Sequence, residues 1–247
     1  TLFRSRALRV GDFVSIGEVM GVVKARLAGK ADMGQVSAAV KALGALDAWM
    51  ERRYREIQRL PHPENYVPDH EEVIYLYGRS FFLKDQPLAD ESRTAVDFFL
   101  GQLRKLWLKT DCRMCQAQGA LALQRFGDTA TPRAILASLK ERSVSHEELG
   151  MFWRDTELSW WWYRAPIETQ ATMVEAFAEV GQDTQAVEDC QVWLLKQKQT
   201  QDWKTTKATA DAIYALQTTG QLGATAAALT AVVVEIRGFE GQLALAG

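Results

Sequence analysis

Cys112 and Cys115 form a C-x-x-C, the chemical motif that is easiest to recognise in this sequence. Such a pair holds zinc when a second pair of ligands completes the site, and it exchanges disulfides when a strand leads into it. The remaining cysteine, Cys190, stands alone, and no strand pattern precedes Cys112. The spacing places both thiols on adjacent turns of a helix, so it predicts two buried core side chains.

Three carboxylates, Asp155, Glu157 and Glu168, flank an aromatic segment and could serve as a general acid and base. In a ring of helices, such a pair would indicate a glycoside hydrolase or a lyase. We favour a simpler interpretation, in which Asp155 and Glu168 cap or orient helix ends, because no sugar-binding pattern accompanies them. The acidic motifs of terpene cyclases, Asp-x-Asp-Asp and Asp-Asp-x-x-Asp, do not occur in the sequence.

The histidines, His62, His70 and His146, lie far apart, at predicted loops or helix starts. A metal site needs several ligands at close spacing, and the acidic residues beside His70 have the pattern of a helix start. The sequence therefore predicts no metal site and no cofactor.

Aromatic side chains gather at Trp160, Trp161, Trp162 and Tyr163, and Trp203 follows later in the chain. Aromatic residues stack on sugars, sit at membrane interfaces and concentrate in binding hot spots. Four consecutive aromatics cannot all face one core, so at least one should be partly exposed. Packing of a long loop is the simpler interpretation, and a surface that faces a partner or docks a neighbouring domain is the alternative.

The elements that would position these residues are helices. Apolar residues recur at helical spacing along most of the chain, and turns that contain Gly, Pro or Asp separate the helices. Helix and turn repeat about five times, which fits an open solenoid or a closed α/α toroid. Irregular helix lengths favour the toroid. The sequence predicts an all-α fold, a toroid of helical hairpins that is incomplete at its N-terminus, with a short β segment at Ala231–Ile236 near the C-terminal end.

Local signals place several of these elements. A helix is predicted over Asp12–Leu27, and Asp69 is predicted to cap a later one. Pro166 is predicted to open another helix, and Asp183 or Thr184 is predicted to start the one after it. Ser145-x-x-Glu148 is a capping-box pattern and predicts a short helix, followed by a loop over Met151–Tyr163. The charged residues of Glu51–Glu56 predict a solvated helix face. We expect residues 1–222 to form the toroid and residues 223–247 to begin a β-domain or form a tail.

Composition excludes some classes of function. The chain has 247 residues, of which 47% are hydrophobic, enough for one sizeable core or two small ones. Its formal net charge is −2 and its basic residues are scattered, so the sequence predicts no nucleic-acid partner. No apolar run reaches the roughly 18 residues that a membrane-spanning helix requires.

Six short stretches carry a family resemblance. They are Pro166–Ala171, Trp193–Gln199, Trp203–Thr209, His62–Pro68, Arg125–Asp128 and Leu139–Arg142. They resemble the bacterial branch of the alpha-2-macroglobulin family, in the C-terminal part of its thioester-containing α/α toroid domain. The likeness covers most of the chain from Leu43 to Gly220, and it is most specific over Trp203–Leu216.

The resemblance implies a non-catalytic scaffold in a protein that traps or inhibits endopeptidases by a conformational change. It also implies target proteases and neighbouring domains of the same chain as partners, and a periplasmic or cell-envelope location. The family's thioester forms within Cys-Gly-Glu-Gln, which this sequence lacks. We therefore expect that the motif lies upstream of Thr1 or that this member has no thioester. The alternative is an enzyme on the same ring, a polysaccharide lyase or glycoside hydrolase.

Overall fold

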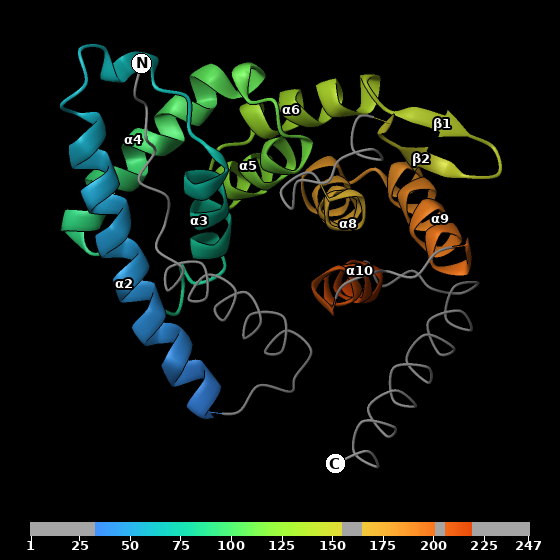
Figure 1. Cartoon of the computed structure of the whole chain (residues 1–247), viewed down its shortest axis with the longest axis horizontal. Coiled ribbons are helices and arrows are strands. Elements are labelled where there is room, and N and C mark those ends of the chain that lie inside the picture. The colour runs from blue at the N-terminus through green and yellow to red at the C-terminus, as the bar shows by residue number, and fades with distance from the viewer. Residues whose placement is uncertain (1–32, 155–164, 201–205, 219–247) are drawn as a thin grey trace. The chain divides into compact units, whose positions relative to one another are not determined.

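The computed structural model describes residues 33–154, 165–200 and 206–218. Within these ranges the fold is all-α, with eight α-helices and one short antiparallel hairpin (Figure 1). The predicted helix at Asp12–Leu27 and the predicted strand at Ala231–Ile236 lie outside the described residues, as does the predicted domain boundary after residue 222.

The chain divides into two compact units, Thr1–Ser138 and Leu139–Gly247. Helix α6 (Ala130–Glu141) carries the chain from one unit into the next. Each unit is built from helices that follow one another in sequence. The closure of these helices into an α/α toroid stays a prediction.

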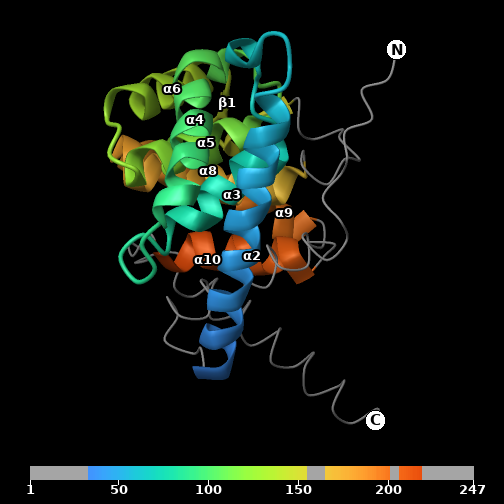
Figure 2. The same ribbon diagram turned by 90° about the vertical axis from the view of Figure 1, so that its left-hand side faces the viewer.

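Four helices build the first unit: α2 (Met33–Ile57), α3 (His70–Ser80), α4 (Asp90–Leu106) and α5 (Arg113–Arg125). Helix α2 packs against α4 and α3, and α3 packs against α5 (Figure 2). Large buried side chains fill the space between them, namely Met50, Ile57, Tyr75, Leu76, Phe99, Leu121 and Leu123.

Residues at the ends of these helices explain where the helices begin or end. Asp69 caps α3 as predicted, in a capping box with Glu72. Helix α4 begins at Asp90, and its first turn is acidic, which suits the positive end of the helix dipole. Gly127 follows α5 with a φ of 96°, a left-handed conformation that glycine adopts without steric cost.

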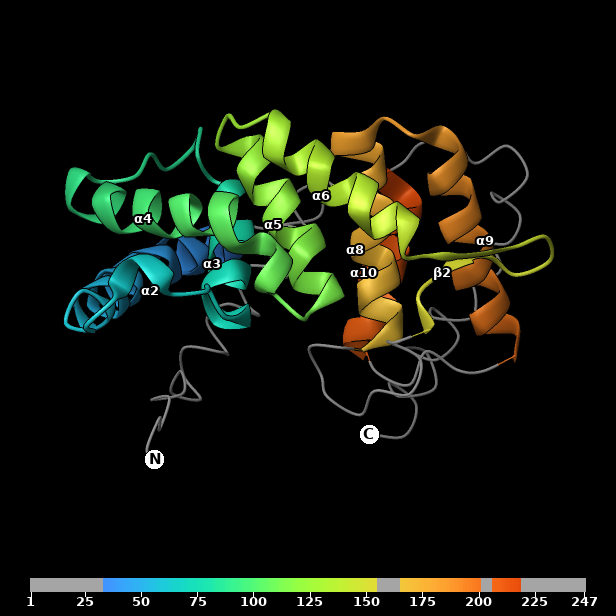
Figure 3. The ribbon, with the colours of Figure 1, turned by 90° about the horizontal axis from the view of Figure 1, so that it is seen from above.

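The second unit contains α8 (Pro166–Ala176), α9 (Thr184–Thr200), α10 (Thr206–Thr218) and the hairpin of β1 (Val144–His146) and β2 (Gly150–Phe152). Helix α8 begins at proline, as predicted, and continues into a π-helical turn, η4 (Phe177–Gly181). It packs against both α10 and α9. Strand β2 lies against α9 (Figure 3).

The hairpin corrects the prediction of a short helix after Ser145 and of a loop at Met151. Val144 pairs with Phe152 and His146 pairs with Gly150. In the turn, Nδ1 of His146 accepts the backbone N–H groups of Glu148 and Leu149, at 3.2 and 3.3 Å. The imidazole therefore takes the capping role that the pattern gave to Ser145, and the chain reverses instead of coiling.

Gly150 allows the hairpin to approach α9 closely. Its φ is 76°, and a Cβ atom at this position would overlap the backbone carbonyl oxygen of Asp189. Any other residue would meet both a strained backbone and this overlap. The hairpin is thus positioned by a backbone-to-backbone contact.

Beyond the hairpin, Trp153 anchors the core of the second unit and is 1% exposed. Its ring stacks on Phe177, with the centroids 6.3 Å apart, and its indole N–H donates to the Leu139 carbonyl at 2.9 Å. Gln170 lies nearby, and its amide donates to the carbonyls of Met151 and Cys190, at 2.6 and 3.2 Å. The Trp153 indole and the Gln170 amide are therefore both paired. Within residues 33–154, 165–200 and 206–218, none of the helices has the length and apolar character of a membrane-spanning segment.

Candidate functional site

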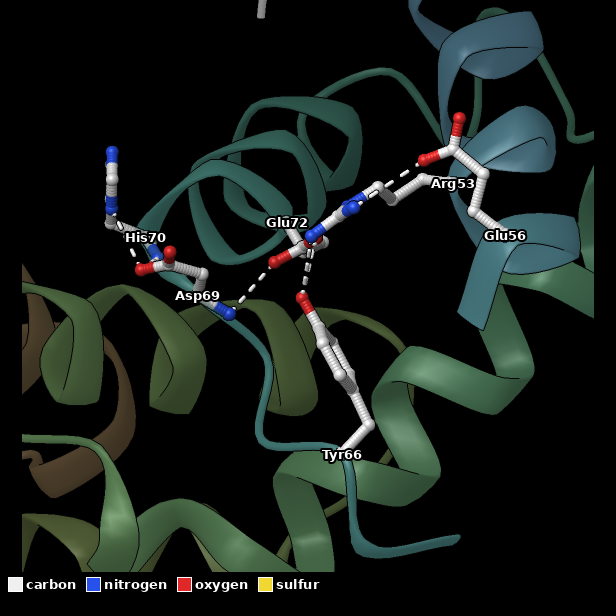
Figure 4. Close-up of polar contacts among 6 residues, drawn as sticks. All are labelled: Arg53, Glu56, Tyr66, Asp69, His70 and Glu72. Carbon is white, nitrogen blue, oxygen red and sulfur yellow. Dashed lines mark hydrogen bonds and ion pairs between the residues drawn. The ribbon is translucent and has the colours of Figure 1, made fainter. Parts of the chain in front are cut away.

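A buried carboxylate, Glu72, gathers the densest polar network of the first unit. It is fully buried, and Oε1 accepts the Arg53 Nε–H at 2.7 Å and the Tyr66 hydroxyl at 2.9 Å. Oε2 accepts the backbone N–H of Asp69 at 2.7 Å. Figure 4 shows the guanidinium and the phenol converging on Glu72, whereas the imidazole of His70 points away. Both oxygens of this carboxylate are therefore occupied.

Three parts of the chain deliver these groups. Arg53 comes from α2, Tyr66 from the connection after it, and Glu72 from the first turn of α3. The capping box explains the last of these, because Glu72 must reach back to the Asp69 N–H. The position of Arg53 corrects the predicted solvated face of α2, since its side chain is 20% exposed and faces Glu72.

The network shifts the pKa values of Arg53 and Tyr66. Burial alone would lower the pKa of Arg53, but the hydrogen bond and the charge of Glu72 outweigh it and raise that pKa. Burial, followed by the charge of Glu72, raises the pKa of Tyr66 well above its usual value. Tyr66 thus stays protonated and donates to Glu72. Arg53 and Glu72 thus form a buried ion pair that, together with Tyr66, fixes the connection between α2 and α3.

A second buried ion pair joins the same two helices, and here the carboxylate comes from α2 and the guanidinium from α3. Oδ1 of Asp47, on α2, accepts the Tyr75 hydroxyl at 2.6 Å and the Arg79 Nε–H at 3.0 Å, both from α3. Burial, with the Asp47 charge beside it, raises the pKa of Tyr75. Asp47 pairs with the end of α3 and Arg53 with its start, so the two helices run antiparallel. Each helix gives the other one carboxylate and one guanidinium.

Gln102 holds the connection between α2 and α3 from the other side. This buried amide on α4 donates to the carbonyls of Pro63, Glu64 and Tyr66, at 3.3, 3.0 and 2.8 Å. The three carbonyls belong to a short 3-10 helix, η1 (Pro63–Asn65), and to the residue after it. Proline has no backbone N–H, and Gln102 supplies this connection with a donor from α4, in addition to the connection's own bond from the Tyr66 N–H to the Pro63 carbonyl.

We expect Gln102→Leu to lower the free energy of unfolding by about 1–3 kcal/mol, because it keeps the side-chain volume and removes the donor. The freed connection should also be cut faster by trypsin after the exposed Arg59. Limited proteolysis with mass spectrometry measures the cleavage rate. Gln86→Leu, at an exposed position, is the matched control. Equal cleavage of both variants would show that the amide does not hold the loop.

His70 pairs with its neighbour Asp69 at the start of α3, with Nδ1 and Oδ1 2.8 Å apart. The hydrogen bond from His70 lowers the pKa of the Asp69 carboxyl. Burial would lower the pKa of His70, but the hydrogen bond and charge of Asp69, with the charges of Glu71 and Glu72, raise it above the usual 6.5. A positive imidazole is thus favoured here by its acidic neighbours.

The pKa shift of His70 predicts a pH-dependent stability. A raised pKa contributes stability that is fully present below pH 6.5 and is lost as the pH rises through the value in the folded state. The stability difference between the wild type and His70→Gln should therefore be larger at about pH 5.5 than at about pH 9. Urea unfolding of both proteins at the two pH values measures it. A difference that is constant or grows with pH would contradict this assignment.

The residues predicted for partner contact or domain docking, Trp160, Trp161, Trp162, Tyr163 and Trp203, lie outside the described residues, as do Asp155 and Glu157. Glu168 is described, and it is buried in the first turn of α8, where its carbonyl accepts the Thr172 hydroxyl at 2.8 Å. Its position at a helix start agrees with the structural interpretation of this carboxylate.

The structure also shows where the cysteines and histidines lie. Cys112 and Cys115 are buried, as predicted, and they are joined by a disulfide that the spacing did not predict. Cys190 is a buried free thiol whose pKa is raised by burial. His62 contacts Glu64 on the surface, at 3.1 Å. Within the described ranges, no group of His, Cys, Asp or Glu side chains is placed to hold a metal ion.

Comparison with models of known protein families gives no match, and comparison with curated protein sequences gives none either. The Glu72 network and Gln102 are therefore interpreted from their own geometry. One signal for them is visible in the sequence, the Asp69-x-x-Glu72 capping box at the start of α3.

Proposed function

We propose that this chain is a non-catalytic helical scaffold of a bacterial alpha-2-macroglobulin-like protein that traps or inhibits endopeptidases by a conformational change. The proposal includes the α/α toroid, a periplasmic or cell-envelope location, and neighbouring domains of a longer chain as partners. Six stretches of sequence suggest the family, and one of them, His62–Pro68, lies in the connection that Gln102 and Glu72 hold.

The observation that carries the proposal is the pair of reciprocal ion pairs between α2 and α3, Arg53 with Glu72 and Asp47 with Arg79. Their charged groups are engaged with one another. Buried ion pairs add little net stability, but they specify which helix faces fit together. A pair of helices held in this way is suited to move as one rigid body when a trap closes. The proposal gives no residue of α2 or α3 a catalytic role.

The mechanism proposed here is steric. A protease cuts a segment elsewhere in the longer protein, and the scaffold shifts as a unit when the strain is released. Because the sequence has no Cys-Gly-Glu-Gln, this chain supplies no thioester for covalent capture. If the longer protein carries Cys-Gly-Glu-Gln upstream of this chain, it would capture proteases covalently as well as sterically.

A comparison of substrate sizes tests the proposal. The longer protein that contains this chain is mixed with an endopeptidase, and cleavage of a large dye-labelled protein and of a small chromogenic peptide is measured. A trap should abolish most cleavage of the protein and leave cleavage of the peptide intact, because the enclosed active site stays open to small molecules. Equal loss on both substrates would indicate an active-site inhibitor, and no loss would reject protease trapping.

A second assay separates the scaffold from an enzyme. The purified chain is incubated with acidic and neutral polysaccharides, and new reducing ends and unsaturated products are measured. We expect none above a buffer blank. Product formation that depends on Glu168 would favour the glycoside hydrolase or lyase instead.

A further inference from the structure

The start of α5 holds a joined pair of cysteines. Cys112 is the N-cap residue and Cys115 lies in the first turn, with their Cα atoms 5.1 Å apart and a disulfide between them. Sγ of Cys112 also accepts the backbone N–H of Cys115, at 3.1 Å. Of the pair, Cys112 is the more accessible residue, 8% exposed against 1% for Cys115.

A disulfide that closes so short a loop adds little stability to the fold. A disulfide stabilises a fold mainly by restricting the unfolded chain, and the effect grows with the length of the closed loop. Only Arg113 and Met114 lie between these cysteines. The turn is also held without the bridge, because the Gln116 side chain donates to the Thr110 and Trp107 carbonyls, at 2.8 and 3.3 Å. Stability alone does not explain the bond.

The surroundings favour a negative sulfur at Cys112. The N-terminus of α5, a helix of 13 residues, carries a partial positive charge, and one of its N–H groups already points at this sulfur. Thr110, two residues earlier, has a buried hydroxyl with no hydrogen-bond partner among the described residues. Cys190 differs, because burial raises its pKa and keeps it a thiol.

We propose that Cys112 and Cys115 form a thiol–disulfide exchange site that accepts two electrons from thiol reductants, with Cys112 as the sulfur that is attacked. A reductant thiolate attacks Sγ of Cys112, the bond to Cys115 breaks, and Cys115 leaves as a thiolate that takes up a proton. A second reductant thiolate then attacks the reductant's sulfur in the mixed disulfide. Cys112 is released as a thiolate, the protein is reduced, and the reductant leaves as its disulfide. This proposal does not rest on the proposed protease-trap function.

A redox titration of the folded protein tests the site. The chain is equilibrated in native buffer with glutathione mixtures of different reduced-to-oxidised ratio, quenched in acid, alkylated after denaturation and weighed intact. Of the three cysteines, one should be alkylated in oxidised mixtures and all three in reduced ones, while circular dichroism stays unchanged. A pair that stays oxidised until the fold is denatured, or one that stays reduced in oxidised glutathione, would overturn the proposal.

Single variants identify the attacked sulfur. Cys115→Ala keeps a small buried side chain and should accumulate one glutathione on Cys112 when treated with oxidised glutathione. Cys112→Ser keeps an oxygen at the N-cap, where serine is favoured, and should accumulate at least ten times less adduct. Cys190→Ala is the matched control and should titrate as the wild type does. An equal adduct on Cys112→Ser would overturn the assignment of Cys112, and the wild-type titration does not depend on how the variants fold.

Discussion

Asp47→Ala is expected to lower the free energy of unfolding by about 4 kcal/mol, because it strands the buried cation of Arg79. The Arg79 side chain is 2% exposed, and its Nη1 has no hydrogen-bond partner among the described residues. The substitution also removes the acceptor of the Tyr75 hydroxyl. A charge left in this position can neither reach water nor find a new partner.

Glu72→Ala removes the other buried carboxylate and should cost less, about 3 kcal/mol, because Arg53 is 20% exposed and also pairs with Glu56. Urea unfolding with linear extrapolation measures both variants. Glu56→Ala is the control, and it should change stability by no more than about 0.5 kcal/mol because Glu56 lies on the surface. If Asp47→Ala were no more harmful than Glu56→Ala, the ion pairs would have no part in holding α2 to α3.

Trp153→Ala is expected to cost about 3–5 kcal/mol through loss of its buried ring. The ring fills the space beside Phe177, and its N–H satisfies the Leu139 carbonyl. The substitution leaves a cavity lined by apolar side chains and one carbonyl without a donor. We expect a matching fall in the thermal midpoint, measured by circular dichroism.

Trp153→Phe separates the two contributions. It keeps an aromatic ring against Phe177 and removes the indole N–H, so it should cost about 1–3 kcal/mol, less than the alanine variant. Val192→Ala, at an exposed position on α9, is the control and should be nearly neutral. A phenylalanine variant as unstable as the alanine variant would mean that the hydrogen bond, rather than the ring, holds this core.

Helices that begin with a strong local signal were predicted well. Asp69 caps α3, Asp183 accepts the Ala186 N–H at the start of α9, and Pro166 opens α8. In each case one or two adjacent residues satisfy the first turn, so the signal is complete within the sequence. The C-x-x-C is buried as predicted, but only Cys115 lies within a helix, because Cys112 is the extended N-cap of α5.

The hairpin at Val144–Phe152 was mispredicted because its cause is not local. The Ser145-x-x-Glu148 pattern is adequate for a helix start, but β2 is selected by burial of its residues and by contact with α9. Both depend on a helix that lies more than thirty residues further along the chain. Tertiary packing overrode the local preference.

The Glu72 network could not be predicted from the sequence for a similar reason. Arg53 and Glu72 are 19 positions apart, and Gln102 meets the loop from 36 to 39 positions away. Helical periodicity placed Arg53 on a charged face beside Arg55, which is indeed exposed. The difference between the two arginines arises only when α3 folds back along α2.

Gly150 has a practical consequence for labelling the protein. Because the hairpin meets α9 through main-chain atoms, position 150 tolerates no side chain, whereas Glu147 and Glu148 at the tip are exposed. A fluorophore attached at Glu147 would extend into solvent and leave the contacts of His146 with the Glu148 and Leu149 N–H groups in place. The tip is therefore a suitable handle for following the protein in larger assemblies without disturbing its core.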